Sequence, residues 1–148
     1  MKKSAPILYA TDFSPASRAA LDQACVLARD RRAPLVITHV LLTPSPLVLE
    51  GAVFPQALQE LETQIRADAV RRLAALAKRV KKTGLAVTAI LLRGVPHQEI
   101  VKLARKRGAA MVVVGTHGRT GVSRLIVGSV AGRLVAAATC PVLTVRGH

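Results

Sequence analysis

The chain has 148 residues, and its Lys and Arg outnumber its Asp and Glu by 22 to 8, a formal net charge of +14 at pH 7. This length suits one domain with a real core. No apolar run reaches the ~18 residues of a membrane-spanning helix, and the run at 7–10 is too short for a signal peptide, so we expect a cytoplasmic protein.

The first third of the chain predicts a strand, a helix and a second strand. Residues 6–11 are a short apolar run that we interpret as a strand ending at Asp12. Ser14 followed by Pro15 is typical of a helix N-cap and first helical position. A second run rich in β-branched residues, 35–40, predicts the next strand.

The middle of the chain predicts a long connection, a long helix and a third strand. Residues 41–55 hold three prolines and one glycine, and an irregular connection of this length is usually functional or mobile. Apolar residues then recur every three or four positions, which predicts a helix over 56–83 with Gly84 as its C-cap. A third strand is expected over 85–92.

The last third continues the alternation. Pro96 begins a predicted helix that stops at Gly108, and a fourth strand is centred on residues 112–114. A helix over 129–138 and a strand over 142–145 complete the chain. Strands alternating with helices predict a single doubly wound α/β domain with a mainly parallel sheet.

A glycine-rich segment between the fourth strand and the last helix predicts an anion site. It contains Gly115 and Gly118, and after nine further residues Gly128 and Ser129 lead into the helix. Glycines let the backbone approach a ligand closely, and a helix N-terminus offers N–H groups and a partial positive charge. The segment is not a P-loop, because no Gly-Lys-Ser/Thr occurs in the chain. A plain glycine-rich surface loop is the alternative.

Side chains around this segment suit a nucleotide. His117, Arg119 and Arg124 could contact phosphates, or could be ordinary surface residues. The Asp12 carboxylate could accept two ribose hydroxyls, or could only turn the chain toward the following helix. Ligands of doubly wound sheets bind where the strand order reverses, so Asp12 and Gly115 would face one crevice if their strands are adjacent there.

Three other residues have a structural interpretation. His39, near the end of the second strand, is expected to be a packed residue. Cys25 and Cys140 lie far apart among apolar residues, which favours buried thiols; a redox pair is the alternative.

The chain resembles the nucleotide-binding universal stress proteins over essentially its whole length. Gly115, Gly118, Gly128 and Ser129 match the family motif G-2x-G-9x-G-[ST]. The segments 11–14 (Thr-Asp-Phe-Ser), 94–96 (Gly-Val-Pro) and 140–142 (Cys-Pro-Val) are also typical. The resemblance implies a five-stranded parallel sheet of order 3-2-1-4-5 flanked by about four helices, and a homodimer formed through the last strand.

The resemblance also implies how ATP is bound. Asp12 would lie by the ribose hydroxyls and the main chain of Val40 by the adenine edge. The remaining contacts, around the ribose, the phosphates and the pocket wall, would be Thr11, Val114, Gly115, Gly118, Arg119, Gly128, Ser129 and Val130. Any Mg²⁺ would be held by the phosphates. Gly118→Val or Gly128→Val should abolish binding, because the side chain fills phosphate space and a positive φ is penalised.

These features predict an ATP-binding regulatory or sensor module of stress adaptation. We expect at most slow ATP hydrolysis, because His117 is the only candidate general base beside the phosphate segment. The alternative is a basic interaction protein that binds nucleic acid or an acidic partner. The near absence of aromatic residues argues against a protein that stacks single-stranded bases.

Overall fold

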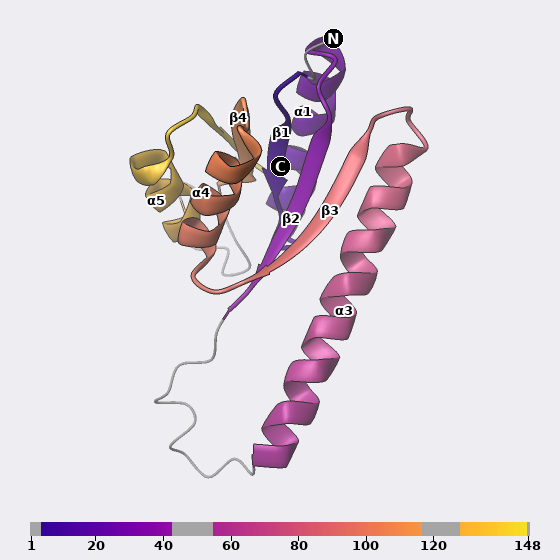
Figure 1. The fold of residues 1–148 in the computed structure, drawn as a ribbon, viewed down its shortest axis with the longest axis vertical. Coiled ribbons are helices and arrows are strands. Elements are labelled where there is room, and N and C mark those ends of the chain that lie inside the picture. Colours follow the sequence, from indigo (N-terminus) through magenta and orange to yellow (C-terminus); the bar gives the residue numbers. More distant parts are fainter. Residues whose placement is uncertain (1–3, 43–54, 117–127, 148) are drawn as a thin grey trace.

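The structure, a computed structural model, describes residues 4–42, 55–116 and 128–147. In these ranges strands and helices alternate (Figure 1). The elements are β1 (Ile7–Ala10), α1 (Pro15–Asp30), β2 (Leu35–Leu41), α3 (Pro55–Lys81), β3 (Val87–Arg93), α4 (Pro96–Arg107), β4 (Met111–Gly115), α5 (Ser129–Ala137) and β5 (Val142–Val145). The strands are all parallel and follow the order β3-β2-β1-β4-β5, which confirms the predicted fold.

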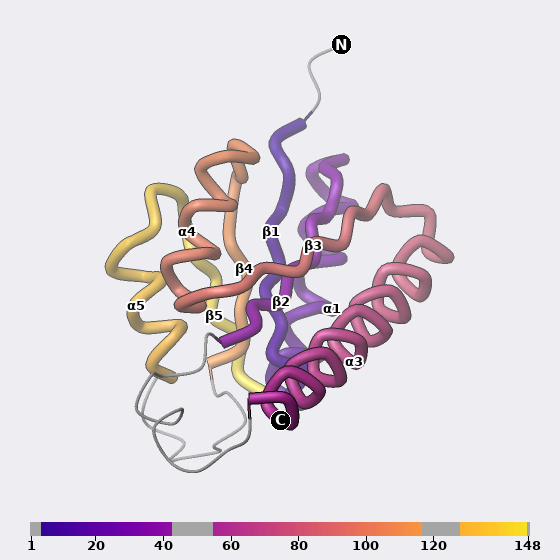
Figure 2. Tube along the Cα trace, turned by 60° about the horizontal axis from the view of Figure 1, so that its bottom comes forward, coloured from indigo at the N-terminus to yellow at the C-terminus, as the bar shows by residue number. Residues whose placement is uncertain are grey.

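The sheet lies between two helical layers, as Figure 2 shows. Helices α1 and α3 cover one face, where Tyr9, Leu21 and Leu73 belong to one buried cluster. Helices α4 and α5 cover the other face, where Ile100 and Leu134 belong to a second cluster. Because the central strands are buried on both faces, they read as continuous apolar runs in the sequence.

The start of α1 follows the predicted chemistry. Ser14 is the N-cap, and its side chain accepts a hydrogen bond of 3.3 Å from the N–H of Ser17. The buried hydroxyl of Tyr9 donates to the carbonyl of Ser17 at 2.6 Å and so ties β1 to this first turn. Burial raises the pKa of the Tyr9 hydroxyl above its ordinary value.

Helix α3 differs from the expectation at both ends. It spans Pro55–Lys81, and Thr83 and Gly84 turn the chain by donating their N–H groups to the carbonyls of Val80 and Lys81. Gly84 (φ +86°) therefore lies in the turn beyond the helix, where the prediction made it the C-cap. Because this turn occupies the residues around Gly84, strand β3 begins only at Val87, two residues later than predicted.

The apolar stripe of α3 is buried only in its second half. Its buried residues are Ala69, Leu73, Ala77 and Val80, whereas Leu61 and Ile65 are half exposed. A helix of 27 residues is about 40 Å long, and a strand of seven residues about 23 Å. The first half of α3 therefore runs past the edge of the sheet (Figure 1).

The remaining boundaries are close to those predicted. Gly108 ends α4 in the left-handed conformation (φ +58°), as expected of a C-cap glycine. Helix α5 ends at Ala137, one residue before the prediction. Cys25 is buried with the α1 face and Cys140 packs at the α4 face, so the sheet separates the two free thiols. None of the described helices has the length and apolar character that crossing a bilayer requires.

Candidate functional site

A cleft of about 930 Å³ opens at the carboxyl edge of the sheet, where the adjacent strands β1 and β4 end. Eight of the twelve predicted site residues belong to the described chain, and all eight line this cleft: Thr11, Asp12, Val40, Val114, Gly115, Gly128, Ser129 and Val130. The other four, His117, Gly118, Arg119 and Arg124, lie outside the described residues, as do most residues of the predicted connection 41–55.

The turn from β1 to α1 is built by the side chains of Thr11 and Asp12. The Thr11 hydroxyl oxygen accepts hydrogen bonds from the N–H of Phe13 (2.9 Å) and the hydroxyl of Ser17 (2.7 Å). The Asp12 Oδ1 accepts from the N–H of Ser14 at 2.9 Å. Asp12 therefore turns the chain toward α1, as one of the two interpretations of the sequence expected, and it also lines the cleft.

The main chain of Val40 faces the cleft. The carbonyl of Thr38 accepts from the N–H of Thr11 on the β1 side, and the carbonyl of Leu41 accepts from Gly94 on the β3 side. Since successive residues of a strand direct their polar groups to opposite sides, the N–H and C=O of Val40 point to the β1 side. Strand β1 pairs only as far as Thr38, so these groups point beyond its end, into the region of the cleft.

Two aromatic rings form one wall of the cleft. Phe13 and His39 have ring centroids 4.6 Å apart. The His39 Nδ1 lies 2.7 Å from the carbonyl oxygen of Thr11, which only accepts, so Nδ1 carries the proton. His39 is a packed strand residue, as expected, and also faces the cleft. Phe13 has φ +64°, which is unusual for a residue other than glycine.

Gly115 has a packing role that the sequence motif does not reveal. A Cβ at this position would lie 2.9 Å from the carbonyl carbon and 3.1 Å from the carbonyl oxygen of Ala16, in the first turn of α1. Its missing side chain lets α1 approach the end of β4. Gly147, after β5, touches the same turn, since its Cβ would lie 2.7 Å from the Cα of Ala16.

The start of α5 closes the cleft on the β4 side. The N–H of Gly128 donates to the carbonyl of Thr116, which joins the two ends of the glycine-rich segment. Gly128 is the N-cap, and Ser129 is the first helical residue and is exposed. Gly128 has φ −53°, so the expected penalty for a positive φ does not apply to Gly128→Val. The remaining reason to expect Gly128→Val to weaken binding is that the valine side chain would fill the space of a phosphate.

Helix α3 contributes a wall that sequence reasoning missed. Its residues Leu61, Gln64, Ile65, Asp68 and Arg72 line the cleft. The apolar spacing places Leu61 and Ile65 on the apolar stripe of the predicted helix and gives them no role in the site. The one indication in the sequence was the length of the predicted helix. It is longer than any strand, so part of its apolar stripe must extend beyond the sheet.

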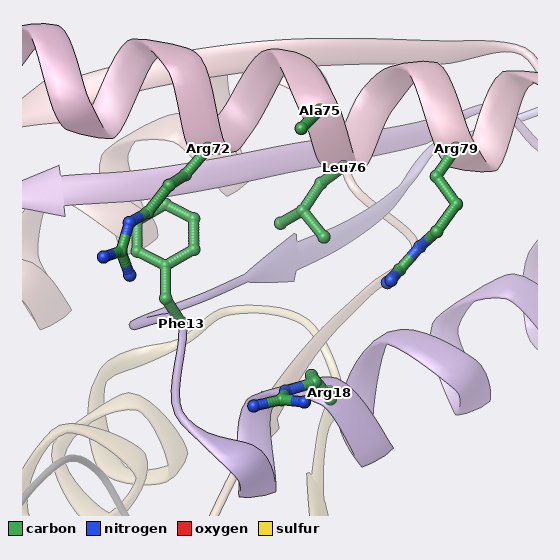
Figure 3. Close-up of a pocket in the computed structure, with 6 residues that line it drawn as sticks. All are labelled: Phe13, Arg18, Arg72, Ala75, Leu76 and Arg79. Carbon is green, nitrogen blue, oxygen red and sulfur yellow. The ribbon is translucent and has the colours of Figure 1, made fainter.

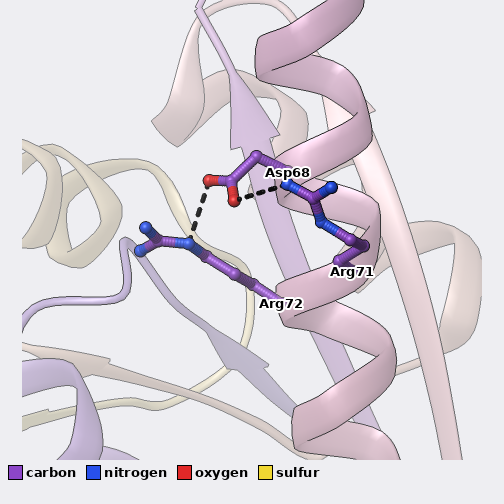
Figure 4. A network of polar contacts seen from close by, with 3 residues as sticks. All are labelled: Asp68, Arg71 and Arg72. Atoms are coloured by element: carbon purple, nitrogen blue, oxygen red, sulfur yellow. Dashed lines mark hydrogen bonds and ion pairs between the residues drawn. The ribbon is translucent and has the colours of Figure 1, made fainter.

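Charged side chains of α3 form a small network at this wall (Figure 4). Asp68 accepts from Arg72 at 2.9 Å and from Arg71 at 3.3 Å. The Arg72 guanidinium also lies 5.4 Å from the centroid of the Phe13 ring. Exposed ion pairs of this kind contribute little to stability, so their effect is to orient Arg72 over Phe13.

A second, smaller groove of about 370 Å³ adjoins this wall between α1 and α3 (Figure 3). Arg18, Arg72 and Arg79 surround an apolar floor that includes Leu76, and Phe13 closes one end. Arg72 and Phe13 line both the groove and the cleft. The groove is positively charged, but its lining residues do not indicate a particular class of ligand.

The described residues include no group of three or more His, Cys, Asp or Glu side chains placed to hold a metal ion. Asp12 and Asp68 are the acidic residues of the cleft lining within those residues. The cleft therefore combines backbone groups, a carboxylate, a helix N-terminus and an aromatic wall. That set of groups suits a polar ligand with an anionic part.

Comparisons with known proteins agree on one family. Residues 4–146 match the profile of the Universal stress protein family. The chain is 31% identical to the universal stress protein YxiE of Bacillus subtilis over 144 residues, which cover 95% of this chain and 97% of that protein. The structure of MJ0577 from Methanocaldococcus jannaschii superposes with a TM-score of 0.82 at 27% identity, over 97% and 96% of the two chains.

A second similar structure contains a nucleotide. The universal stress protein of Archaeoglobus fulgidus, solved in complex with dAMP, has a TM-score of 0.64 at 24% identity, over 95% of this chain and 96% of that one. At this identity the likeness concerns the fold.

Proposed function

Because the chain belongs to the universal stress protein family, we propose that it binds ATP in the cleft at the carboxyl edge and acts as a nucleotide-dependent regulatory module. The observation that carries the proposal is that all eight predicted site residues of the described chain line one cleft. The dAMP complex of the A. fulgidus protein makes an adenine nucleotide the ligand class to test first.

Each part of an adenine nucleotide has a counterpart in the cleft. The outward-pointing main chain of Val40 suits the adenine edge, and the half-exposed Leu61 and Ile65 suit its apolar face. Asp12 suits the ribose hydroxyls. The start of α5, at Gly128, Ser129 and Val130, suits the phosphates. Gly118 and Arg119, which lie outside the described residues, complete the proposed phosphate contacts, with His117 and Arg124 as further candidates.

The first experiment asks which nucleotide binds. Protein purified without added nucleotide is denatured, and the released small molecules are identified by mass spectrometry. Titration calorimetry then compares ATP, ADP, AMP and GTP, with and without Mg²⁺. We expect ATP to bind, with Mg²⁺ held by its phosphates, and to be hydrolysed slowly at most. The proposal would be contradicted if the purified protein released no nucleotide and calorimetry detected no binding of any of the four nucleotides.

The second experiment tests Asp12 without disturbing the turn. Asp12→Asn keeps an oxygen that can accept from the N–H of Ser14, so the fold should be retained. Losing charged hydrogen bonds to the ribose should weaken ATP binding by ~1.5–3 kcal/mol, about 10- to 100-fold. The matched ligand is 2′,3′-dideoxy-ATP, which should bind wild type and variant about equally. An equal loss for both ligands would remove Asp12 from the ribose.

We also propose that the protein forms a homodimer through β5. This strand is at the edge of the sheet, and the pairing of Val145 with β4 leaves the N–H of Thr144 pointing outward. Thr144→Pro removes that N–H from the outer edge and keeps the bonds to β4, whereas Thr144→Val keeps the N–H. Light scattering should give a dimer for wild type and Thr144→Val and a monomer for Thr144→Pro. A dimeric Thr144→Pro would place the interface elsewhere.

A further inference from the structure

The amino edge of the sheet, opposite the cleft, brings three helix ends together. Helices α1, α3 and α4 precede β2, β3 and β4, so all three end at the edge where these parallel strands begin. Hydrogen bonds join the connecting turns: Leu35 N–H to Ala86 O (2.8 Å), Ile7 N–H to Pro34 O (3.0 Å) and Ala110 N–H to Pro6 O (2.9 Å). The three turns are therefore linked along this edge, and they lie at the upper end of Figure 1.

This surface carries a large share of the positive charge. Ten of the chain's 22 Lys and Arg side chains lie in the last turns of the three helices or just beyond them, with one acidic residue, Asp30, among them. We call these ten the basic edge: Arg29, Arg31, Arg32, Lys78, Arg79, Lys81, Lys82, Arg105, Lys106 and Arg107. All ten are exposed.

The charges of the basic edge are not neutralised within the described chain. In residues 4–42, 55–116 and 128–147 the ion pairs engage Arg71, Arg72, Arg93 and Lys102, and none engages the basic edge. A few cations at each helix end would complement the helix dipoles. Ten cations on joined turns repel one another, and a polyanion would relieve that repulsion.

The surroundings of the basic edge favour one class of polyanion. The large apolar side chains that are exposed in the described chain all lie outside these turns: Val26, Leu42, Leu61, Ile65, Val70, Val95 and Val135. Adsorption on a bilayer or docking of an acidic protein normally adds apolar contacts to charge. Stacking of single-stranded bases needs aromatic residues, and of the two Phe and Tyr residues that the structure describes, Tyr9 is buried and Phe13 lies in the cleft.

We propose that the basic edge binds the phosphate backbone of a nucleic-acid duplex without reading its sequence. From the turn before β3 to the turn before β4 the surface spans three strand spacings, roughly 15 Å. A duplex presents one phosphate charge per ~1.7 Å of its axis, roughly nine over that span. With about five phosphates contacted, log K should fall with log salt at a slope of roughly −4 to −5.

Duplex binding at this edge is independent of the nucleotide cleft. The two sites lie at opposite ends of the strands, and the length of β2 alone separates them by about 23 Å. A saturating concentration of ATP should therefore leave the affinity for the duplex unchanged. Failure of nucleotide binding would leave this proposal intact, and failure of duplex binding would leave the nucleotide proposal intact.

The test uses fluorescence anisotropy with a labelled 20-base-pair DNA duplex of arbitrary sequence, titrated with full-length protein at several salt concentrations. The edge variant combines Arg31→Gln, Lys82→Gln and Lys106→Gln, one substitution in each turn. The control variant combines Arg66→Gln, Arg133→Gln and Arg146→Gln, which are exposed cations outside the edge. Both variants have the same net charge, and thermal melting verifies that both are folded.

The edge variant should bind the duplex at least 10-fold more weakly at 50 mM salt, with a slope shallower by up to about 3. The control variant should stay within about twofold of wild type. An equal loss in both variants, or no binding by wild type at 50 mM salt, would overturn the proposal. So would tighter binding of the matching single strand, or equal binding of vesicles with 30% phosphatidylserine.

Discussion

Gly115→Ala is the most direct test of how the β4 end is packed. The added Cβ would lie 2.9 Å from the carbonyl carbon of Ala16 and 3.0 Å from the N of Ser17, both backbone atoms of α1. Neither can rotate away, so α1 must shift from β4. Overpacking of this kind costs ~1–3 kcal/mol, and replacing glycine in a strand returns ~0.4–1 kcal/mol through the unfolded chain. We expect a net destabilisation of about 1–2 kcal/mol.

Urea unfolding followed by circular dichroism measures this loss without nucleotide present. The matched control is Gly132→Ala in α5, where a Cβ meets nothing within 4 Å and the better helix propensity should add up to ~1 kcal/mol. The thermal midpoint of Gly115→Ala should fall by roughly 2–8 °C. A Gly115→Ala protein as stable as wild type would refute the packing role and leave the glycine to the ligand alone.

Four further predictions concern individual side chains and one pair of them. Tyr9→Phe should lower stability by about 1–2 kcal/mol by removing its buried hydrogen bonds. Burial raises the pKa of Tyr9 and Cys25, so the unfolded chain loses these two protons at lower pH than the folded chain does. The free energy of unfolding should therefore fall as the pH rises above about 8, and less steeply in Tyr9→Phe. A flat alkaline profile in urea titrations would contradict this. In native protein Cys140 should react with iodoacetamide before the buried Cys25, as peptide mass spectrometry would reveal; equal rates would contradict the burial. Leu61→Ala with Ile65→Ala should change stability by less than ~1 kcal/mol, because both are half exposed, yet weaken ATP binding measured by calorimetry; unchanged affinity would remove α3 from the site.

Most of the fold could be predicted because its signals are local. Ser14 and Pro15 start α1, Gly108 ends α4, and the buried strands appear as continuous apolar runs. These features depend on neighbours in the sequence, so a reader of the sequence can find them. The order of the strands is not local, and it followed from the family resemblance.

The part of the site that escaped prediction depends on distances in space. The spacing of Leu61 and Ile65 is the same as that of the buried Leu73, so periodicity alone cannot tell a core position from a cleft wall. Gly115 has the same limitation. The motif indicates a ligand, while the contact with Ala16 depends on how closely α1 packs against β4.

Helix α3 has two regions of different stability, because its first half (residues 55–68), which we call the overhang, extends past the edge of the sheet. The turns around Leu73 and Val80 are held by the sheet, whereas the turns before Ala69 have no buried residue. Amide hydrogens of the overhang should therefore exchange with solvent through local opening, far faster than those of the second half. A ligand that contacts Leu61 would slow amide exchange in the first half of α3, while exchange in the core would stay unchanged.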